Sequence, residues 1–405
     1  MAETLKGPAA LRRKLAVKRS RTLTRYRYYE MKHHTEDLGI STPDELRWLT
    51  EVLGWCTKAV DCLADRIQFR EFRDDNLGMN EIFQLNNMDI LTDSAVLSAC
   101  INSCSFIYIS PDETGYPRMQ VIDGANATGE IDPITWLLKE GYAVLKRDSD
   151  KDTPILEAYF TPTETIYYEN GKFTQKVRHG AGQTLLVPII HRPDDKRPFG
   201  HSRISRSCMA LQKSAIRTIK RSEITAEFYS FPQKYAIGIS SDLEMDKWRS
   251  SISSMLTITN DEDGNHPNVG QFNQQSATPH LEQLKMFASL FAGETGLTMD
   301  DLGFPQDNPS SSEAIRAAHE TLRLTGRKAQ RSFGVGFLNA GYVAACLRDN
   351  FPYKRQVAYL TRPVFAPLFE LDNAGMAGLG DAVLKLNQAV PDYIDEEKIK
   401  DLTGI

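Results

Sequence analysis

The spacing of apolar side chains changes along the chain and predicts a mixture of helices and strands. Residues 41–73 and 78–102 carry apolar side chains at intervals of three and four, which is typical of amphipathic helices. The period becomes two in the segments 105–110, 117–124 and 142–148, which we interpret as strands. The N-terminal half of the chain is therefore predicted to be α+β.

The dipeptide Asn170-Gly171 stands between two β-rich arms and predicts a tight hairpin. A two-residue turn of type I′ requires positive φ at both central positions, which Asn and Gly tolerate. We therefore expect residues 165–177 to continue a small antiparallel sheet.

A long helix is predicted over residues 202–230, because Pro232 disfavours helix in the residue before it. On a wheel that advances about 100° per residue, one apolar stripe occupies roughly 80° of arc and a basic face lies nearly opposite. The apolar stripe comprises Ile204, Cys208, Leu211, Ala215 and Ile219. The basic face comprises Arg203, Arg206, Lys213, Arg217, Lys220 and Arg221. Such a helix spans roughly 43 Å, a length that suits packing beside copies of itself or lining a passage.

The second half of the chain is predicted to be mainly helical. Residues 280–297 form a second helix after a short mixed insertion, residues 298–312 a loop rich in Pro, Asn and Ser, and residues 313–349 a third long helix. Helix, insertion and helix suggest two rods that lead out to a small module and return. Four glycines in the third helix indicate close packing or a bend. Residues 351–369 are expected to add a strand, and small helices follow.

Composition is that of a folded soluble protein, with 41% hydrophobic and 25% charged residues among 405. This length permits two or three domains. The sequence contains no run of 18 apolar residues, so no transmembrane helix is predicted. The N-terminus lacks the apolar region of a secretory signal. Six cysteines do not make a disulfide framework, so synthesis in a reducing cytosol fits best.

Charge is distributed unevenly. The net charge of −5 argues against tight general binding to DNA. Residues 12–27, however, carry eight Arg or Lys and no acid. This segment has two interpretations: an arm that meets nucleic acid or an acidic partner, and a solvated helix or frayed terminus.

Catalytic signatures are missing from the sequence. It contains no phosphate loop, no H-E-x-x-H and no dinucleotide fingerprint. Ser202 stands in a G-H-S-R-I stretch without the second glycine of a nucleophile elbow, and we interpret it as a helix cap. Cys100 and Cys104 lack a second ligand pair, so burial is favoured over a zinc site. The chain is predicted to be no enzyme and to hold no metal or cofactor.

Several stretches, taken in order, resemble the portal proteins of tailed bacteriophages. They are AVDCLADRI (59–67), IFQLNNMDI (82–90), RPFGHSRIS (197–205) with the long helix and FPQKYAIG (231–238), and residues 295–322. Their order over roughly residues 25–350 carries the resemblance, since none is a catalytic motif.

The resemblance implies a portal-type ring subunit with an α+β fold. Its parts would be a wing with a basic N-terminal arm (1–200), a stem helix (201–232), a clip (233–277), a second stem helix (278–297), a tunnel loop (298–312), a long bent helix with a wing return strand (313–374) and a short helical crown (375–405).

The resemblance also implies a function. The chain would form a ring, usually of twelve copies, at one capsid vertex of the virion after assembly in the host cytoplasm, with no membrane contact. The ring would be the channel for packaging and ejection of double-stranded DNA. Its partners would be the terminase large subunit, the head–tail connector or adaptor, the major capsid protein and the scaffold.

Three groups of residues are expected to serve these roles. The tunnel-loop contacts to DNA would be Gln306, Asp307, Asn308 and Ser310, the clip docking residues would be Lys247, Trp248 and Arg249, and the basic face of the stem would contain Arg206, Lys213, Arg217 and Lys220.

Two other classes of function stay open at this point. One is a cytosolic enzyme with an unrecognised site around Cys100, Cys104 and His201. The other is a nucleic-acid-binding protein that uses residues 12–27, which would bind DNA with a steep salt dependence.

Overall fold

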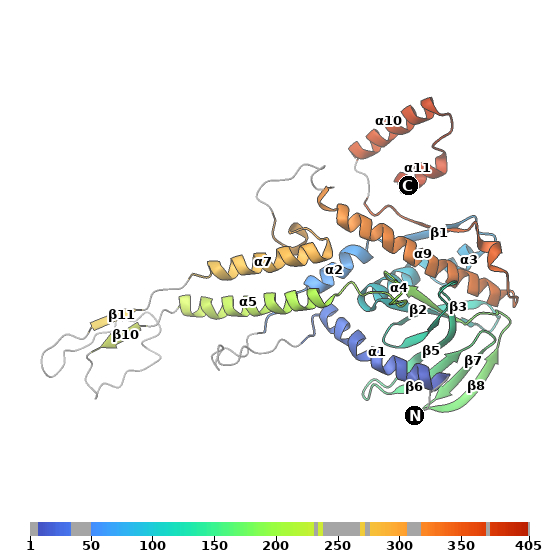
Figure 1. The fold of residues 1–405 in the computed structure, drawn as a ribbon, viewed down its shortest axis with the longest axis horizontal. Helices are drawn as coiled ribbons and strands as arrows, with labels where there is room; N and C mark the ends of the chain where they lie inside the picture. The colour runs from blue at the N-terminus through green and yellow to red at the C-terminus, as the bar shows by residue number, and fades with distance from the viewer. Residues whose placement is uncertain are drawn as a thin grey trace.

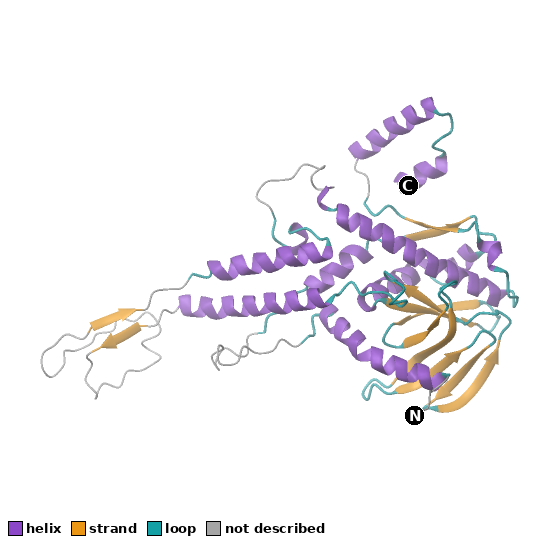
Figure 2. Cartoon of the chain, in the orientation of Figure 1, coloured by secondary structure: helices purple, strands orange, loops and turns teal. Residues whose placement is uncertain are grey.

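The protein is a mixed helix-and-sheet body from which a pair of long helices projects (Figure 1). The computed structural model describes residues 7–33, 50–230, 234–237, 268–271, 276–305, 317–369 and 373–403. Figure 2 shows the strands gathered in the body, apart from one pair beyond the far ends of the projecting helices. The predicted α+β class is confirmed.

The N-terminal part contains more breaks than its periodicity suggested. Its elements are α1 (Pro8–Tyr29), α2 (Trp55–Ala64), β1 (Phe69–Arg73), α3 (Met79–Leu85) and α4 (Met88–Asn102). The single helix predicted over residues 78–102 is divided by Asn87, which adopts a left-handed φ of 53°. Such a φ cannot continue a right-handed helix.

The helix predicted over residues 41–73 is wrong at its C-terminal end, where β1 forms instead. β1 pairs with β12 (Arg362–Phe365), and its register shifts between Phe69 and Glu71. This bulge turns both Phe69 and Phe72 into the core, although strict alternation would place them on opposite faces. Residues 69–73 therefore form a bulged strand in place of the last turns of the predicted helix. The segment 34–49 lies outside the described residues.

Two antiparallel sheets form the centre of the body. The first has the order β3-β2-β9 and the second the order β4-β5-β6-β7-β8. Their bounds are β2 (Cys104–Pro111), β3 (Pro117–Asp123), β4 (Ala127–Ile131), β5 (Leu138–Arg147), β6 (Pro154–Phe160), β7 (Glu164–Glu169), β8 (Lys172–Arg178) and β9 (Leu186–Ile190). The predicted hairpin joins β7 to β8, with φ of 48° at Asn170 and 76° at Gly171.

The projecting pair consists of α5 (Arg206–Ser230) and α7 (Thr278–Thr295). Beyond them lie β10 (Lys234–Ile237) and β11 (Asn268–Gln271), which pair antiparallel. The chain therefore runs out along α5 and returns along α7, as the helix–insertion–helix pattern predicted. The short helix η3 (Asp300–Leu302) follows α7.

The long helix α9 (Glu320–Arg348) crosses the body and contributes a large share of the core, including Phe333 and Phe337. The start predicted at residue 313 lies outside the described residues. A Cβ at Gly341 would lie 2.8 Å from Met79 Sδ, and one at Gly334 would lie 2.7 Å from Pro363 Cγ. The glycines of α9 thus permit close packing, one of the two explanations that the sequence offered.

The chain ends in η4 (Arg355–Ala358), β12, α10 (Asn373–Ala389) and α11 (Glu396–Thr403). Figure 1 shows α10 and α11 at the edge of the body, and α11 approaches β1, where Glu397 lies 3.9 Å from Arg73. Among the described helices, none has the length and apolar character needed to cross a bilayer.

Candidate functional site

The helix pair α5 and α7 is joined along its length by polar contacts. Near the body, Ser205 Oγ donates to Glu294 Oε1 over 2.9 Å. Farther out, Thr218 Oγ1 donates to Gln283 Oε1 over 3.2 Å, and Thr225 Oγ1 lies 3.2 Å from His280 Nε2. These contacts set the register of the two helices, so that the pair behaves as one antiparallel rod.

The base of this rod is anchored in the body by buried polar side chains. Gln212 is fully buried, and its Oε1 accepts a hydrogen bond from the backbone N–H of Cys56 over 2.7 Å. Arg203 is 8% exposed and donates to the carbonyls of Ala59 and Thr295. Burial lowers the pKa of Arg203 from its ordinary value. The sequence placed Arg203 on the exposed basic face, which is wrong because the helix has not yet begun at this residue.

The helix cap is also displaced from its predicted position. Ser202 Oγ donates to the carbonyl of Ile101 over 2.6 Å. Ser205 stands directly before α5, and its Oγ accepts from the N–H of Cys208 over 3.1 Å. An N-cap side chain bonds the third N–H of the helix in this way, so Ser205 and not Ser202 is the cap.

The four basic residues predicted for the stem fall on one face of α5. Arg206 and Arg217 are exposed, whereas Lys213 and Lys220 are half-buried. Their spacings of seven, four and three keep them within roughly 60° of arc. The apolar stripe packs inward on another side, where Cys208 and Ala215 are buried.

The basic N-terminal segment is a helix, α1, that packs on the five-stranded sheet. Leu11 and Leu15 form a small apolar cluster with Tyr142, Val144 and Tyr159. Lys14 Nζ donates to the carbonyl of Gly129 over 2.7 Å, and Lys18 Nζ lies 5.3 Å from the ring centres of both Phe106 and Phe199. Much of its positive charge is therefore satisfied inside the molecule.

The strongest contact of α1 is a forked ion pair. Arg12 Nε and Nη2 donate to the two carboxylate oxygens of Glu157 over 3.0 and 2.9 Å. The Glu157 side chain is 4% exposed, and the Tyr142 hydroxyl donates to it as well. Burial, together with the hydrogen bond to Glu157, raises the pKa of Tyr142 to about 12.

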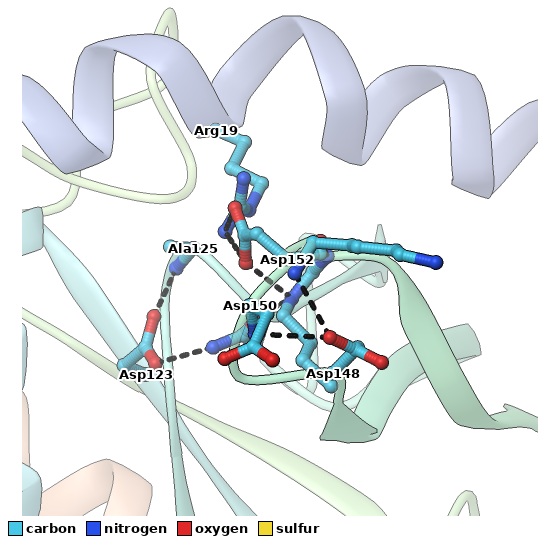
Figure 3. Close-up of polar contacts among 9 residues, drawn as sticks. Arg19, Asp123, Ala125, Asp148, Asp150 and Asp152 are labelled. Carbon is cyan, nitrogen blue, oxygen red and sulfur yellow. Dashed lines mark hydrogen bonds and ion pairs between the residues drawn. The ribbon is translucent and has the colours of Figure 1, made fainter.

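A second polar network holds the middle of α1 (Figure 3). Arg19 Nη2 donates to Asp152 Oδ1 over 2.7 Å, and Arg147 Nη1 donates to the Asp152 carbonyl over 2.9 Å. Arg147 Nε also donates to Asn126 Oδ1 over 2.6 Å, and Asn126 in turn donates to Asp123 over 2.7 Å. The network joins α1 to the β3–β4 and β5–β6 turns, and its acids are engaged by cations and backbone N–H groups.

The residues considered for an enzyme site are buried or engaged in other contacts. Cys100 is fully buried, and burial raises the pKa of its thiol to about 12. Cys104 Sγ accepts a hydrogen bond from Lys18 over 3.1 Å. His201 Nε2 instead lies 2.5 Å from Asp194 Oδ2 in an exposed turn. Among the described residues, no three His, Cys, Asp or Glu side chains converge as metal ligands.

Two groups of predicted site residues lie outside the described residues. They are the tunnel-loop residues Gln306, Asp307, Asn308 and Ser310, and the clip residues Lys247, Trp248 and Arg249. Sequence reasoning missed Gln212 and the Arg12–Glu157 pair, because their partners are 156 and 145 residues away.

Comparison with known proteins identifies the family. The family model described as phage portal protein, SPP1 Gp6-like, matches residues 10–355. The portal protein of Mycobacterium phage L5 is 27% identical over 343 residues, which cover 78% of this chain and 69% of that protein. The portal protein of Mycobacterium phage D29 is 25% identical over 327 residues, which cover 76% and 67%.

A similar solved structure is a chain from the virion of a native gene transfer agent particle. It has a TM-score of 0.49 and 11% identity, and the match covers 95% of this chain and 93% of that chain. The family model spans most of the sequence, from α1 through α9. This chain therefore belongs to the SPP1 Gp6-like family of phage portal proteins.

Proposed function

We propose that twelve copies of this chain form a ring at one capsid vertex, through which double-stranded DNA is packaged and ejected. Membership of a family of structural phage proteins supports this role. The observation that carries it is the rod of α5 and α7, which is anchored in the body at its base and projects from it (Figure 1).

Exposed apolar side chains on α7 support assembly through this rod. Leu281, Met286 and Leu290 are 49%, 50% and 53% exposed. Met286 and Leu290 lie one turn apart on the same face of α7, whereas Leu281 lies on another side of the helix. Exposed apolar side chains on a narrow helix pair form the kind of surface that a neighbouring copy covers. In a ring, each rod has two neighbours that can do so.

The parts of the chain take the following roles in this proposal. Residues 1–200 form the wing, 201–232 and 278–297 the stem, 233–277 the clip, 298–312 the tunnel loop, 313–374 the long helix with the wing return strand, and 375–405 a short crown. The terminase large subunit and the head–tail connector dock on the clip through Lys247, Trp248 and Arg249. The major capsid protein and scaffold contact the wing.

The net negative charge of the chain favours sliding of DNA through the ring over tight binding. Twelve copies at −5 carry a formal charge of −60. Each neutralised phosphate adds affinity that opposes sliding. The loop 303–312 contains no Lys or Arg, so Gln306, Asp307, Asn308 and Ser310 make low-friction contacts. Contacts between cations and phosphates would likewise oppose sliding. In this proposal the basic face with Arg206, Lys213, Arg217 and Lys220 therefore packs on a neighbouring stem and not on the DNA.

ATP hydrolysis comes from the terminase in this proposal, because the sequence has no phosphate loop.

Negative-stain microscopy of the purified chain tests the ring: particles with a central hole are expected, and a stable monomer under capsid-assembly conditions would refute it. Deletion of residues 303–309 tests the tunnel loop. Rings should persist while packaging stops, and normal packaging would contradict the loop's assignment.

A further inference from the structure

A cavity beside α9 has the properties of a binding site. Its volume is about 380 Å³, and it opens between α9, the end of β9 and the loop before β5. Apolar groups from Trp136, Ile190 and Val335 line it, and Arg192, Lys328 and Arg331 add three cations. No Asp or Glu is among its lining residues. We call this feature the α9 cavity.

Two features of the wall are unexplained by the fold alone. Asn339 is 1% exposed; its Nδ2 donates to the Thr135 carbonyl over 3.1 Å, but its Oδ1 has no partner. A buried acceptor without a donor is costly. Trp136 adopts a φ of 61°, which is strained for a bulky residue. Orphaned polar atoms and strained backbone are features that an incoming ligand can use.

The C-terminal pair of helices carries a segment of complementary character. The turn between α10 and α11 and the start of α11, residues 391–397, read P-D-Y-I-D-E-E. Tyr393, the third residue of this segment, is 59% exposed. Four acids flank it. Asp395 and Glu396 form ion pairs with Lys398 and Lys400, and Glu397 lies 3.9 Å from Arg73, so among the described residues Asp392 is the acid of the turn without an ion pair. We call residues 391–397 the acidic turn.

The acidic turn is held in one conformation by its own contacts. Asn387 Nδ2 donates to the carbonyl of Ile394 over 2.9 Å, and its Oδ1 accepts the N–H of Ile394 over 2.8 Å. Lys398 Nζ donates to the carbonyl of Tyr393 over 3.0 Å. A ligand that is ordered before binding loses less conformational entropy on association.

We propose that the acidic turn of one copy docks in the α9 cavity of a neighbouring copy. Tyr393 enters the apolar part of the cavity, and Asp392 meets Arg331 and Lys328. This inference rests on the proposed ring, because the occupant is a second copy of the chain.

Several observations favour a second copy over the chain's own turn. Figure 1 shows α10 and α11 standing away from the middle of α9 in the same chain. Glu397 lies 3.9 Å from Arg73 on the β1 side of the body. Leu384, Leu386 and Val390 are 59%, 45% and 53% exposed. The C-terminal helices therefore offer apolar surface to another molecule.

Site-directed cross-linking of the full chain tests the docking. All six native cysteines are buried, so an engineered exposed cysteine is the reactive one. Chains with Val335→Cys are mixed before assembly with chains carrying Tyr393→Cys, and the rings are treated with a short bismaleimide. A linked pair of chains on a denaturing gel is expected, whereas either variant alone should give none.

A matched control uses a valine on another surface. Val17 on α1 is 66% exposed, more than Val335 at 41%. Val17→Cys chains mixed with Tyr393→Cys chains should not be linked, although the control thiol is the more accessible of the two. Linking of both mixtures to the same extent would show random collision and overturn the proposal.

Charge exchange gives a second readout. Arg331→Asp should lower the yield of linked chains by about tenfold, because like charges then face each other. Asp392→Lys in the partner chain should restore most of that yield. If the exchange does not restore linkage, the proposed contact between Asp392 and Arg331 is wrong.

The outcomes separate this inference from the ring itself, because the same samples are imaged by microscopy. Rings without linkage would overturn the docking and leave the ring standing. A further sample carries Val335→Cys and Tyr393→Cys in one chain. Linkage within this chain, without linkage in the mixture of single variants, would also overturn the docking, by showing that each turn occupies its own cavity. The lack of rings would refute the proposed function and this inference with it.

Discussion

Removal of the Arg12 guanidinium should release α1 from the body. Arg12→Met leaves the Glu157 carboxylate, 4% exposed, with the Tyr142 hydroxyl but without its cation. Breaking a fully buried pair in this way costs about 3–5 kcal/mol, and an exposed pair contributes about 1 kcal/mol or less. Because Arg12 itself is 47% exposed, we expect an intermediate cost of about 2 kcal/mol.

Limited trypsin digestion measures this cost directly. The segment 12–27 offers eight Lys or Arg, and cleavage inside α1 requires the helix to open. When opening is fast relative to cleavage, the cleavage rate follows the population of the open form. A cost of about 2 kcal/mol therefore raises the rate about 30-fold, since about 1.4 kcal/mol corresponds to tenfold.

The neighbouring Arg13 provides the control. It is exposed, and Arg13→Met removes one trypsin site just as Arg12→Met does. Its cleavage rate should change by less than about threefold, as expected for a surface substitution. Adding Glu157→Gln to Arg12→Met should recover part of the loss, because the buried charge is then gone. Equal rates for the two single variants would refute the argument that the Arg12–Glu157 pair holds α1.

Four further predictions concern pH dependence, packing at two glycines and the burial of the thiols. Burial lowers the pKa of His191 to about 3. Because this histidine is protonated in the unfolded chain below about pH 6.5 but stays neutral in the folded chain, the free energy of unfolding should be highest above that pH and lower by about 2 kcal/mol at pH 5. His191→Gln should reduce this pH dependence of the free energy of unfolding, as measured by urea titration. Gly341→Ala would place its Cβ 2.8 Å from Met79 Sδ, so overpacking of about 1–3 kcal/mol should exceed the helix gain of about 1 kcal/mol and lower Tm. Gly380→Ala, with open space around it, should raise Tm or leave it unchanged. A disulfide reagent at pH 8 should label Cys100 and the other five buried thiols only after urea is added, and rapid labelling of the native protein would contradict their burial.

The local sequence pattern was sufficient for elements whose signals lie within a few residues. The C-terminal end of α5, the Asn170-Gly171 turn and the helical character of α7 all depend on contacts between near neighbours or on short-range backbone preference. The family resemblance was likewise readable, because it depends on the order of such segments. The absence of a phosphate loop is a property of the sequence itself.

Features that depend on distant partners were decided by the folded structure. Residues 69–73 were predicted as the end of a helix, but this segment pairs with β12, and a bulge turns both Phe69 and Phe72 inward. The sequence pattern placed Arg12 and Arg203 among exposed basic residues. In the folded structure Arg12 pairs with Glu157, and Arg203 donates to the carbonyls of Ala59 and Thr295. The reason is physical: helix periodicity and turn geometry involve residues close together in the chain, whereas the environment of a charge is set by whichever segments the fold packs around it.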